Sequence, residues 1–194
     1  MSEKKLDNSY YTTNDVVALA KDLIGKELHV KTDASCRSGI IVETEAYSYL
    51  ERGCHAYDNK RTNRTEPLFN EGGIAYVYLC YGIHYLFNIV TNKKDKAEAV
   101  LIRALQPNIG FDANAKKPSS RITAGPGKLS KVMGIDLSHN KLRLTEDTIW
   151  LTESVDNSLK IEASKRIGID YAGEDANLLW RFAAKNSPWL SKKL

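Results

Sequence analysis

The stretch of sequence that decides the fold is residues 40–47, IIVETEAY. Its β-branched and aromatic residues favour a strand, where acidic residues are disfavoured unless something requires them. Side chains alternate along a strand, so we expect one face to carry Ile41, Glu43, Glu45 and Tyr47. Two carboxylates therefore point the same way, beside a tyrosine.

The spacing of these carboxylates allows two interpretations. Cα atoms two residues apart on one strand face lie about 7 Å from each other, near the separation of carboxylates that activate water for displacement at a sugar carbon. Such a pair works as general base and general acid, or as a base with an electrostatic partner. In the other interpretation both side chains lie in water on the open face of an antiparallel sheet, which is the commoner arrangement. The spacing alone leaves both interpretations open.

Length and charge indicate one globular domain with a polar partner. The 194 residues suffice for a single core, and we expect residues 1–10 to form a flexible tail and residues 11–194 to form the domain. The net charge is only +4, but residues 116–131 and 181–194 contain basic residues and no acidic ones. Such blocks suit contacts with phosphates, although a solvated face is the commoner reason for a charge run.

Metal, disulfide and membrane roles find no support in the sequence. The three cysteines lack a Cys-x-x-Cys pair, and the four histidines do not complete a zinc pattern. We therefore expect no metal and no cofactor. The sequence has no signal peptide and no apolar run of the roughly 20 residues that span a bilayer, which predicts a soluble, cytoplasmic protein. No pattern encodes the oligomeric state, and a monomer is the simpler expectation.

Periodicity places the remaining elements. A helix is expected over residues 14–24, a hairpin from strands 74–81 and 86–91, a strand over 99–105, and a short helix from Gly125 to Met133. Residues 48–73 form a long irregular segment, which favours a functional loop. Tyr81 then lies at the hairpin tip, where it either wedges into nucleic acid or folds back onto its own sheet.

Three polar residues have both a structural and a functional interpretation. His55 is a base or substrate contact, or it makes a structural hydrogen bond. Asn88, inside a strand, is a structural bracket or reads the edge of a polar ligand. Arg103 needs a glutamate or a phosphate as its partner. Lys128, at the start of the helix from Gly125, is positioned to help hold a phosphate.

Taken together, these segments resemble the alkyladenine DNA glycosylases, also called methylpurine or 3-methyladenine DNA glycosylases. The resemblance covers the chain from about residue 10 onward. It rests on VETEAY (42–47), AYVYLCYG (75–82), Asn88, VLIRAL (100–105), GPGKL (125–129), RIG (166–168), Arg181-Phe182 and SPW (187–189).

The resemblance implies an α+β domain with a curved antiparallel sheet flanked by helices and a β-hairpin that inserts into DNA. It also implies a monofunctional enzyme of base excision repair, in which water displaces an extruded purine from double-stranded DNA. The expected substrates are 3-methyladenine and 7-methylguanine. Hypoxanthine is neutral, and its departure needs a proton donor that the sequence does not reveal.

The resemblance also implies a role for individual residues. Glu45 matches the general base, and Arg103 matches a residue that supports the water and phosphate site. The base pocket is implied to contain Tyr47, His55, Tyr78 and Asn88, with Asn88 disfavouring guanine by crowding its 2-amino group. Tyr81 matches the residue inserted into the duplex, with Leu68 as an apolar plug beside it. Lys128 and Arg166 are expected to contact DNA phosphates.

One departure and two alternatives remain. Glu66 adds an acid to a loop that is commonly more basic in the family, which puts the phosphate contacts of that loop in doubt. The first alternative is a hydrolase of nucleosides or small N-glycosides that uses Glu43 and Glu45 as its acid pair. The second is a module that binds DNA damage through its tyrosines and basic segments without catalysis.

Overall fold

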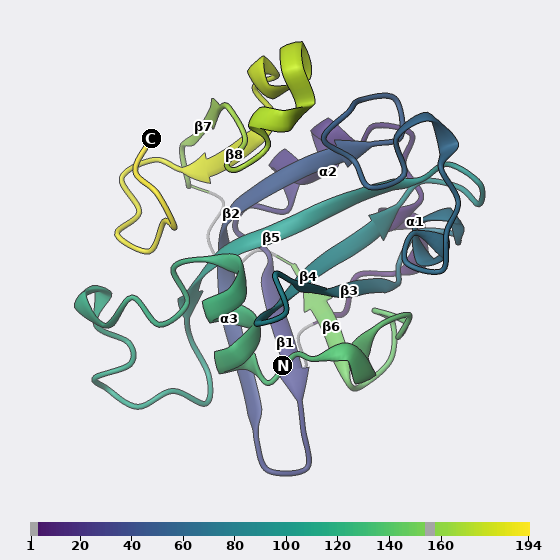
Figure 1. Cartoon of the computed structure of the whole chain (residues 1–194). Helices are drawn as coiled ribbons and strands as arrows, with labels where there is room; N and C mark the ends of the chain where they lie inside the picture. Colours follow the sequence, from purple (N-terminus) through teal and green to yellow (C-terminus); the bar gives the residue numbers. More distant parts are fainter. Residues whose placement is uncertain (1–3, 154–157) are drawn as a thin grey trace.

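A curved antiparallel sheet forms the centre of the chain in the computed structural model, which describes residues 4–153 and 158–194 (Figure 1). The strands follow in the order β3 (Ala75–Cys80), β4 (His84–Thr91), β5 (Glu98–Pro107), β2 (Cys36–Ser48), β1 (Glu27–Lys31) and β6 (Ile149–Thr152). A further strand, β8 (Arg181–Ala184), pairs with β2 and with β7 (Ile161–Ser164). The α+β class with a curved antiparallel sheet is confirmed.

Helices are few and short. The α-helices are α1 (Asn8–Tyr11), α2 (Val16–Asp22) and α3 (Pro126–Met133). Short 3-10 helices cover Tyr57–Asn59, Glu66–Phe69, Pro118–Ser120, Leu137–His139 and Asp170–Asn177. Within the described ranges, no helix combines the length and apolar character needed to cross a bilayer.

Strand β2 carries the predicted carboxylates and pairs with three other strands. Its register with β5 shifts on both sides of Glu43, which marks a bulge in the strand. Bulges of this kind increase the local twist and redirect side chains. The expectation that Glu43, Glu45 and Tyr47 share a face is confirmed, because Arg103 of β5 contacts both carboxylates and the Tyr47 hydroxyl contacts Glu45. Before the bulge, Ile41 lies in the main core.

Helix α2 covers the opposite face of β2. Asp15 caps its N-terminus by accepting hydrogen bonds from the backbone N–H groups of Val17 and Ala18. Thr44, which points away from the carboxylates, donates from its hydroxyl to the carbonyl oxygen of Ala20 over 2.7 Å. The helix thus closes one side of the strand and leaves the carboxylate side for the site.

A second, smaller hydrophobic cluster anchors the loop between β2 and β3. It consists of Cys54, Ala56, Leu68, Phe69, Ile74, Tyr76, Val90, Ala97 and Ala99. The expectation that Leu68 intercalates in DNA is corrected here, because its side chain is only 2% exposed. Its apolar surface is used to hold the loop against the sheet, and it is not free to enter a duplex.

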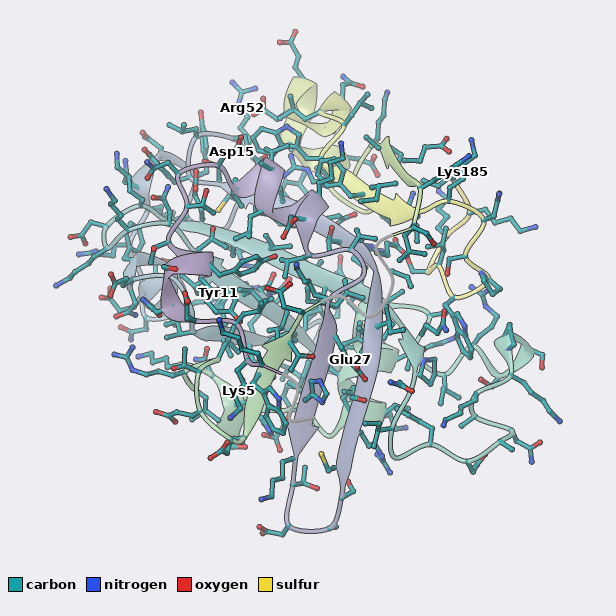
Figure 2. All side chains as sticks on the ribbon, turned by 180° about the vertical axis from the view of Figure 1, so that it is seen from behind. Lys5, Tyr11, Asp15, Glu27, Arg52 and Lys185 are labelled. Atoms are coloured by element: carbon teal, nitrogen blue, oxygen red, sulfur yellow. The ribbon has the colours of Figure 1, made fainter. Side chains whose placement is uncertain are left out.

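The expectation of a flexible tail over residues 1–10 does not hold for residues 5–10, and residues 1–3 lie outside the described residues. The backbone N–H of Leu6 donates to the carbonyl oxygen of Leu151 over 2.9 Å, and the Leu6 side chain is buried. Asp7 caps α1, and Tyr11 at the end of that helix is fully buried. Lys5 and Tyr11 lie against the body of the molecule in Figure 2. Residues 5–10 therefore belong to the domain, because Leu6 supplies an apolar contact that a polar composition conceals.

Hydrogen bonds to Glu43 connect the C-terminal segment of the chain to β2. Oε1 of Glu43 accepts from Arg103 Nε at 3.0 Å, from Arg181 Nε at 2.8 Å and from Ser191 Oγ at 2.7 Å. Oε2 accepts from the backbone N–H of Ser191 at 2.6 Å. One buried carboxylate thus joins β2, β5, β8 and the segment that follows β8.

We expect Glu43→Ala to lower the free energy of unfolding by about 3–5 kcal/mol, because it leaves Arg103 and Arg181 buried without their shared partner. Urea denaturation measures this loss. The matched control is Glu162→Ala, which removes a surface ion pair with Lys185 and should change stability by less than about 0.5 kcal/mol. Equal losses of stability in the two variants would show that the contacts of Glu43 do not stabilise the fold.

Candidate active site

A pocket of about 680 Å³ opens on the carboxylate side of β2. This volume lies within the range typical of sites for small molecules. Its wall includes most of the predicted site residues, namely Tyr47, His55, Leu68, Tyr78, Tyr81, Asn88, Arg103 and Lys128. Glu45 and Arg166 are not part of the wall, and each lies one layer behind it.

Glu45 lies behind the wall with its carboxylate held by three donors. Oε2 accepts from the Tyr47 hydroxyl at 2.8 Å and from Arg103 Nη1 at 3.1 Å. Oε1 accepts from the backbone N–H of Ile167 at 2.7 Å. All three donor residues line the pocket, so they connect a carboxylate with no exposed surface to the space in front of it.

The pKa values of the two carboxylates of β2 are shifted in opposite directions. Burial raises the pKa of Glu45, and the opposing effects of Arg103 and the Ile167 N–H do not cancel that rise. Burial also acts to raise the pKa of Glu43, but Arg103, Ser191 and Arg181 together hold it below the usual glutamate value. Two acids whose pKa values are pushed apart commonly have different roles. Glu43 fits a permanent anion, and Glu45 fits a proton acceptor.

Aromatic rings form the wall in front of Glu45. The rings of Tyr76 and Tyr78 lie 5.3 Å apart between centroids, and His55 meets Tyr78 edge-on at 4.7 Å. Tyr47, from strand β2, lines the same pocket and completes the group. We call these four residues the aromatic cage. Their π faces suit a flat ligand, above all a cationic one.

His55 is neutral in this cage. Burial lowers its pKa to about 4, assisted by the positive charge of Arg64. Nη2 of Arg64 lies 3.3 Å from His55 Nε2, and His55 Nδ1 lies 3.1 Å from the Tyr76 hydroxyl. A guanidinium only donates hydrogen bonds, so Nε2 accepts and Nδ1 carries the proton. The imidazole therefore has no proton to give from the nitrogen that faces Arg64.

Asn88 occupies the pocket wall next to the cage. Its side-chain nitrogen donates to the carbonyl oxygen of Tyr76 over 3.1 Å, across the pair β3 and β4. This bond satisfies the structural interpretation of a buried asparagine, and the position on the wall also permits contact with a ligand. The two interpretations that the sequence left open are therefore compatible.

The hairpin between β3 and β4 presents Tyr81 at its tip, as expected. Tyr81 is 91% exposed and has a backbone φ of 49°, a conformation that is uncommon for tyrosine. Leu79 and Ile83 beside it are also exposed. The ring does not fold back onto its sheet, and an apolar tip stands at the rim of the pocket.

The two residues expected at phosphates differ in position. Lys128 is exposed at the start of α3, on the rim of the pocket. Arg166 is only 5% exposed, and its guanidinium binds both oxygens of Glu51 at 2.7 Å. Its Cζ also lies 4.8 Å from the centroid of the Tyr47 ring. The expectation for Arg166 is corrected, because its charge is already paired and it supports Tyr47.

Sequence reasoning missed several contributors to the pocket. Tyr76 was not assigned to the pocket, but it shares a strand face with Tyr78, so the period of two was the signal that could have found it. Ile167 contributes a backbone N–H, which no side-chain pattern reveals. Arg64 was one basic residue among several in its loop. Among the residues that the structure describes, no group of three or more His, Cys, Asp or Glu side chains forms a metal-binding cluster.

Comparison with known proteins agrees with this geometry. The family described as methylpurine-DNA glycosylase matches residues 10–188. Proteins named "Putative 3-methyladenine DNA glycosylase" are similar over nearly the whole chain. The one from Natranaerobius thermophilus is 46% identical and covers 96% of this chain and 98% of its own length. The one from Clostridium beijerinckii is 43% identical, with 97% and 99% covered.

A third protein of that name, from Chlamydia felis, is 41% identical and covers 91% of this chain and 94% of its own length. The family match spans most of the chain, and the carboxylate behind an aromatic cage lies inside the matched region. The chain therefore belongs to the methylpurine-DNA glycosylase family.

Proposed function

We propose that this DNA glycosylase excises 3-methyladenine and 7-methylguanine from double-stranded DNA, with Glu45 as general base and Arg103 supporting the water and phosphate site. The observation that carries the proposal is the position of the Glu45 carboxylate directly behind an aromatic cage. The cage suits a flat cation, and the carboxylate suits the positive charge that develops on the sugar as the bond breaks.

Extrusion of the base comes first. A purine inside the stack is out of reach, and removing it from the duplex costs a few kcal/mol. The exposed ring of Tyr81 is placed to fill the gap and offset that cost. The extruded purine then enters the cage between Tyr47 and Tyr78, with His55 and Asn88 at its edges. Lys128 on the rim is placed to contact a phosphate.

Hydrolysis follows at the N-glycosidic bond. The bond between the sugar carbon C1′ and the purine nitrogen breaks, and its electron pair leaves with the base and neutralises the base's positive charge. Water forms the new bond to C1′ and gives its proton to Glu45. The ionised carboxylate stabilises the sugar cation until water attacks. A cationic purine needs no proton from the enzyme in order to leave.

The attacking water must reach a carboxylate with no exposed surface. The Tyr47 hydroxyl now donates to Glu45 Oε2 on the pocket side. Displacing this one hydrogen bond allows a water molecule to bridge Glu45 and the sugar. Arg103 Nη1 and the Ile167 N–H keep the carboxylate oriented meanwhile. The Tyr47 ring and the general base Glu45 thus act on the same side of β2.

The contacts of Glu43 argue against a hydrolase that uses both acids. Glu43 accepts hydrogen bonds from four donor groups, which belong to Arg103, Arg181 and Ser191. Ser191 alone donates to both carboxylate oxygens of Glu43. A module that only binds damage has no need of a buried carboxylate with a raised pKa, such as Glu45. Activity on a methylated duplex and on the free methylated nucleoside separates these alternatives from a glycosylase.

We expect Glu45→Gln to reduce release of free base from alkylated duplex DNA by at least about 100-fold, since loss of a general base typically costs 10²- to 10⁴-fold. Affinity for the duplex should survive, because the substitution keeps the size of a buried side chain. Single-turnover release with chelator present, and binding by fluorescence anisotropy, measure the two effects. Retained turnover by Glu45→Gln would remove Glu45 as the base.

The pH dependence follows from the raised pKa of Glu45. The base must be ionised, so activity should fall as the pH falls, with a midpoint above the ordinary glutamate value of 4.5. The lowered pKa of Glu43 stabilises the fold above its unfolded-state pKa, and this contribution disappears only as the pH falls through its lower folded-state pKa. Circular dichroism over the same range should therefore report a folded protein. A midpoint at or below 4.5 would contradict the assignment.

Tyr81→Ala should weaken base extrusion by about 5- to 150-fold, the range of about 1–3 kcal/mol that one aromatic stacking contact supplies. Fluorescence of 2-aminopurine beside the target base reports extrusion. Ile109→Ala is the control, because it also removes an exposed apolar side chain and lies outside the pocket wall. If both variants extrude the base like the wild type, Tyr81 is not the inserted residue.

A further inference from the structure

Arg64 extends from the loop between β2 and β3 into the aromatic cage. Its Cζ lies 4.8 Å from the centroid of the Tyr78 ring. Its Nη2 lies at hydrogen-bonding distance, 3.3 Å, from His55 Nε2. The guanidinium is thus a flat, delocalised cation that stacks on one member of the cage and donates to another.

These contacts are the ones that an alkylated purine would need. A guanidinium stacks on aromatic faces through its planar, delocalised charge, and a cationic purine uses the same face of Tyr78. The acceptor nitrogen of His55 is also occupied. Two cations in the same cage would in addition repel each other. Arg64 and an extruded base therefore exclude each other from the cage.

Arg64 is free to leave because, among the described residues, no carboxylate pairs with its charge. Its side chain is exposed, and among the described residues no carboxylate lies within ion-pair distance of it. Arg61, in the same loop, is different, since it pairs with Asp95 and with Glu66. A DNA duplex brings phosphates to the rim of the pocket, and a guanidinium pairs well with phosphate. A free nucleoside brings none.

We propose that Arg64 is a specificity-determining residue that fills the aromatic cage until DNA phosphate draws it away. This inference rests on the proposed function of the cage. A duplex repays the loss of the Arg64 contacts with a new ion pair, whereas a free base or nucleoside has to displace Arg64 without compensation. Arg64 thereby favours purines carried by DNA over free purines.

The test compares Arg64→Ala and Arg64→Gln with the wild type, and Gln keeps part of the side-chain length without the charge. The first probe is the cationic nucleoside 7-methylguanosine, with binding followed by tyrosine fluorescence. Both variants should bind it about 2- to 30-fold more tightly, the range that one cation–π contact supplies. The second probe is an alkylated duplex, which both variants should bind more weakly. The two probes are therefore expected to respond with opposite signs.

Arg61→Ala is the matched control, because it removes the same charge from the same loop outside the pocket wall. It should leave the affinity for 7-methylguanosine unchanged. Unchanged nucleoside affinity in Arg64→Ala, or equal or tighter binding of the duplex, would overturn the proposal. Base release by the wild type tests the glycosylase assignment separately, so failure of one leaves the other standing.

A readout in the protein itself covers the case in which no variant binds the nucleoside. NMR titration of the His55 ring should show a higher pKa in Arg64→Ala, because the neighbouring positive charge is gone. Adding undamaged duplex to the wild type should shift the His55 resonances as Arg64 leaves, and it should shift them less in Arg64→Ala. Identical His55 behaviour in the two proteins would overturn the proposal.

Discussion

The structure depends on one buried guanidinium, that of Arg103, held between two glutamates of the same strand. Its Nε contacts Glu43 and its Nη1 contacts Glu45, at 3.0 and 3.1 Å. Charges in a protein interior are tolerated only when they are paired and hydrogen-bonded. Arg103 lets two acids point inward from β2, and the acids in turn keep Arg103 ionised despite its burial, which acts to lower its pKa. The two ion pairs of Arg103 therefore hold together the side of β2 on which the pocket opens.

The two acids have different surroundings, and in the proposed function Glu43 anchors the fold while Glu45 takes part in the reaction. Glu43 is saturated by partners from β5, β8 and the segment beyond, so it anchors the sheet to the end of the fold. Glu45 shares Arg103 with it but has its remaining donors on the pocket wall. The difference comes from the neighbours, since both residues are fully buried. Glu45 accepts a hydrogen bond from the pocket-lining Tyr47, whereas Ser191 donates to both oxygens of Glu43.

Much of this arrangement is visible in the sequence, and what is hidden depends on distant partners. Alternation along β2 places Glu43 and Glu45 together, and the glycine after Tyr81 marks the hairpin tip. The roles expected for Leu68 and Arg166, by contrast, were wrong. A small hydrophobic cluster buries the leucine, and Glu51 takes the arginine's charge, although 115 residues separate the pair along the chain. Local patterns report periodicity well, but they carry no record of which remote residue satisfies a charge.

The partners of Glu43 also differ in when they become available during synthesis of the chain. Arg181 and Ser191 lie 138 and 148 residues after Glu43 in the chain. Synthesis proceeds from the N-terminus, so these two residues leave the ribosome long after β2 and β5. Until then Glu43 has only Arg103 as its partner, and Arg103 is shared with Glu45. A nascent chain can therefore pair β2 with β5 before Glu43 meets its partners in β8 and in the segment that follows it. The C-terminal segment thus supplies the partners that relieve Arg103 of being the sole counter-ion of Glu43.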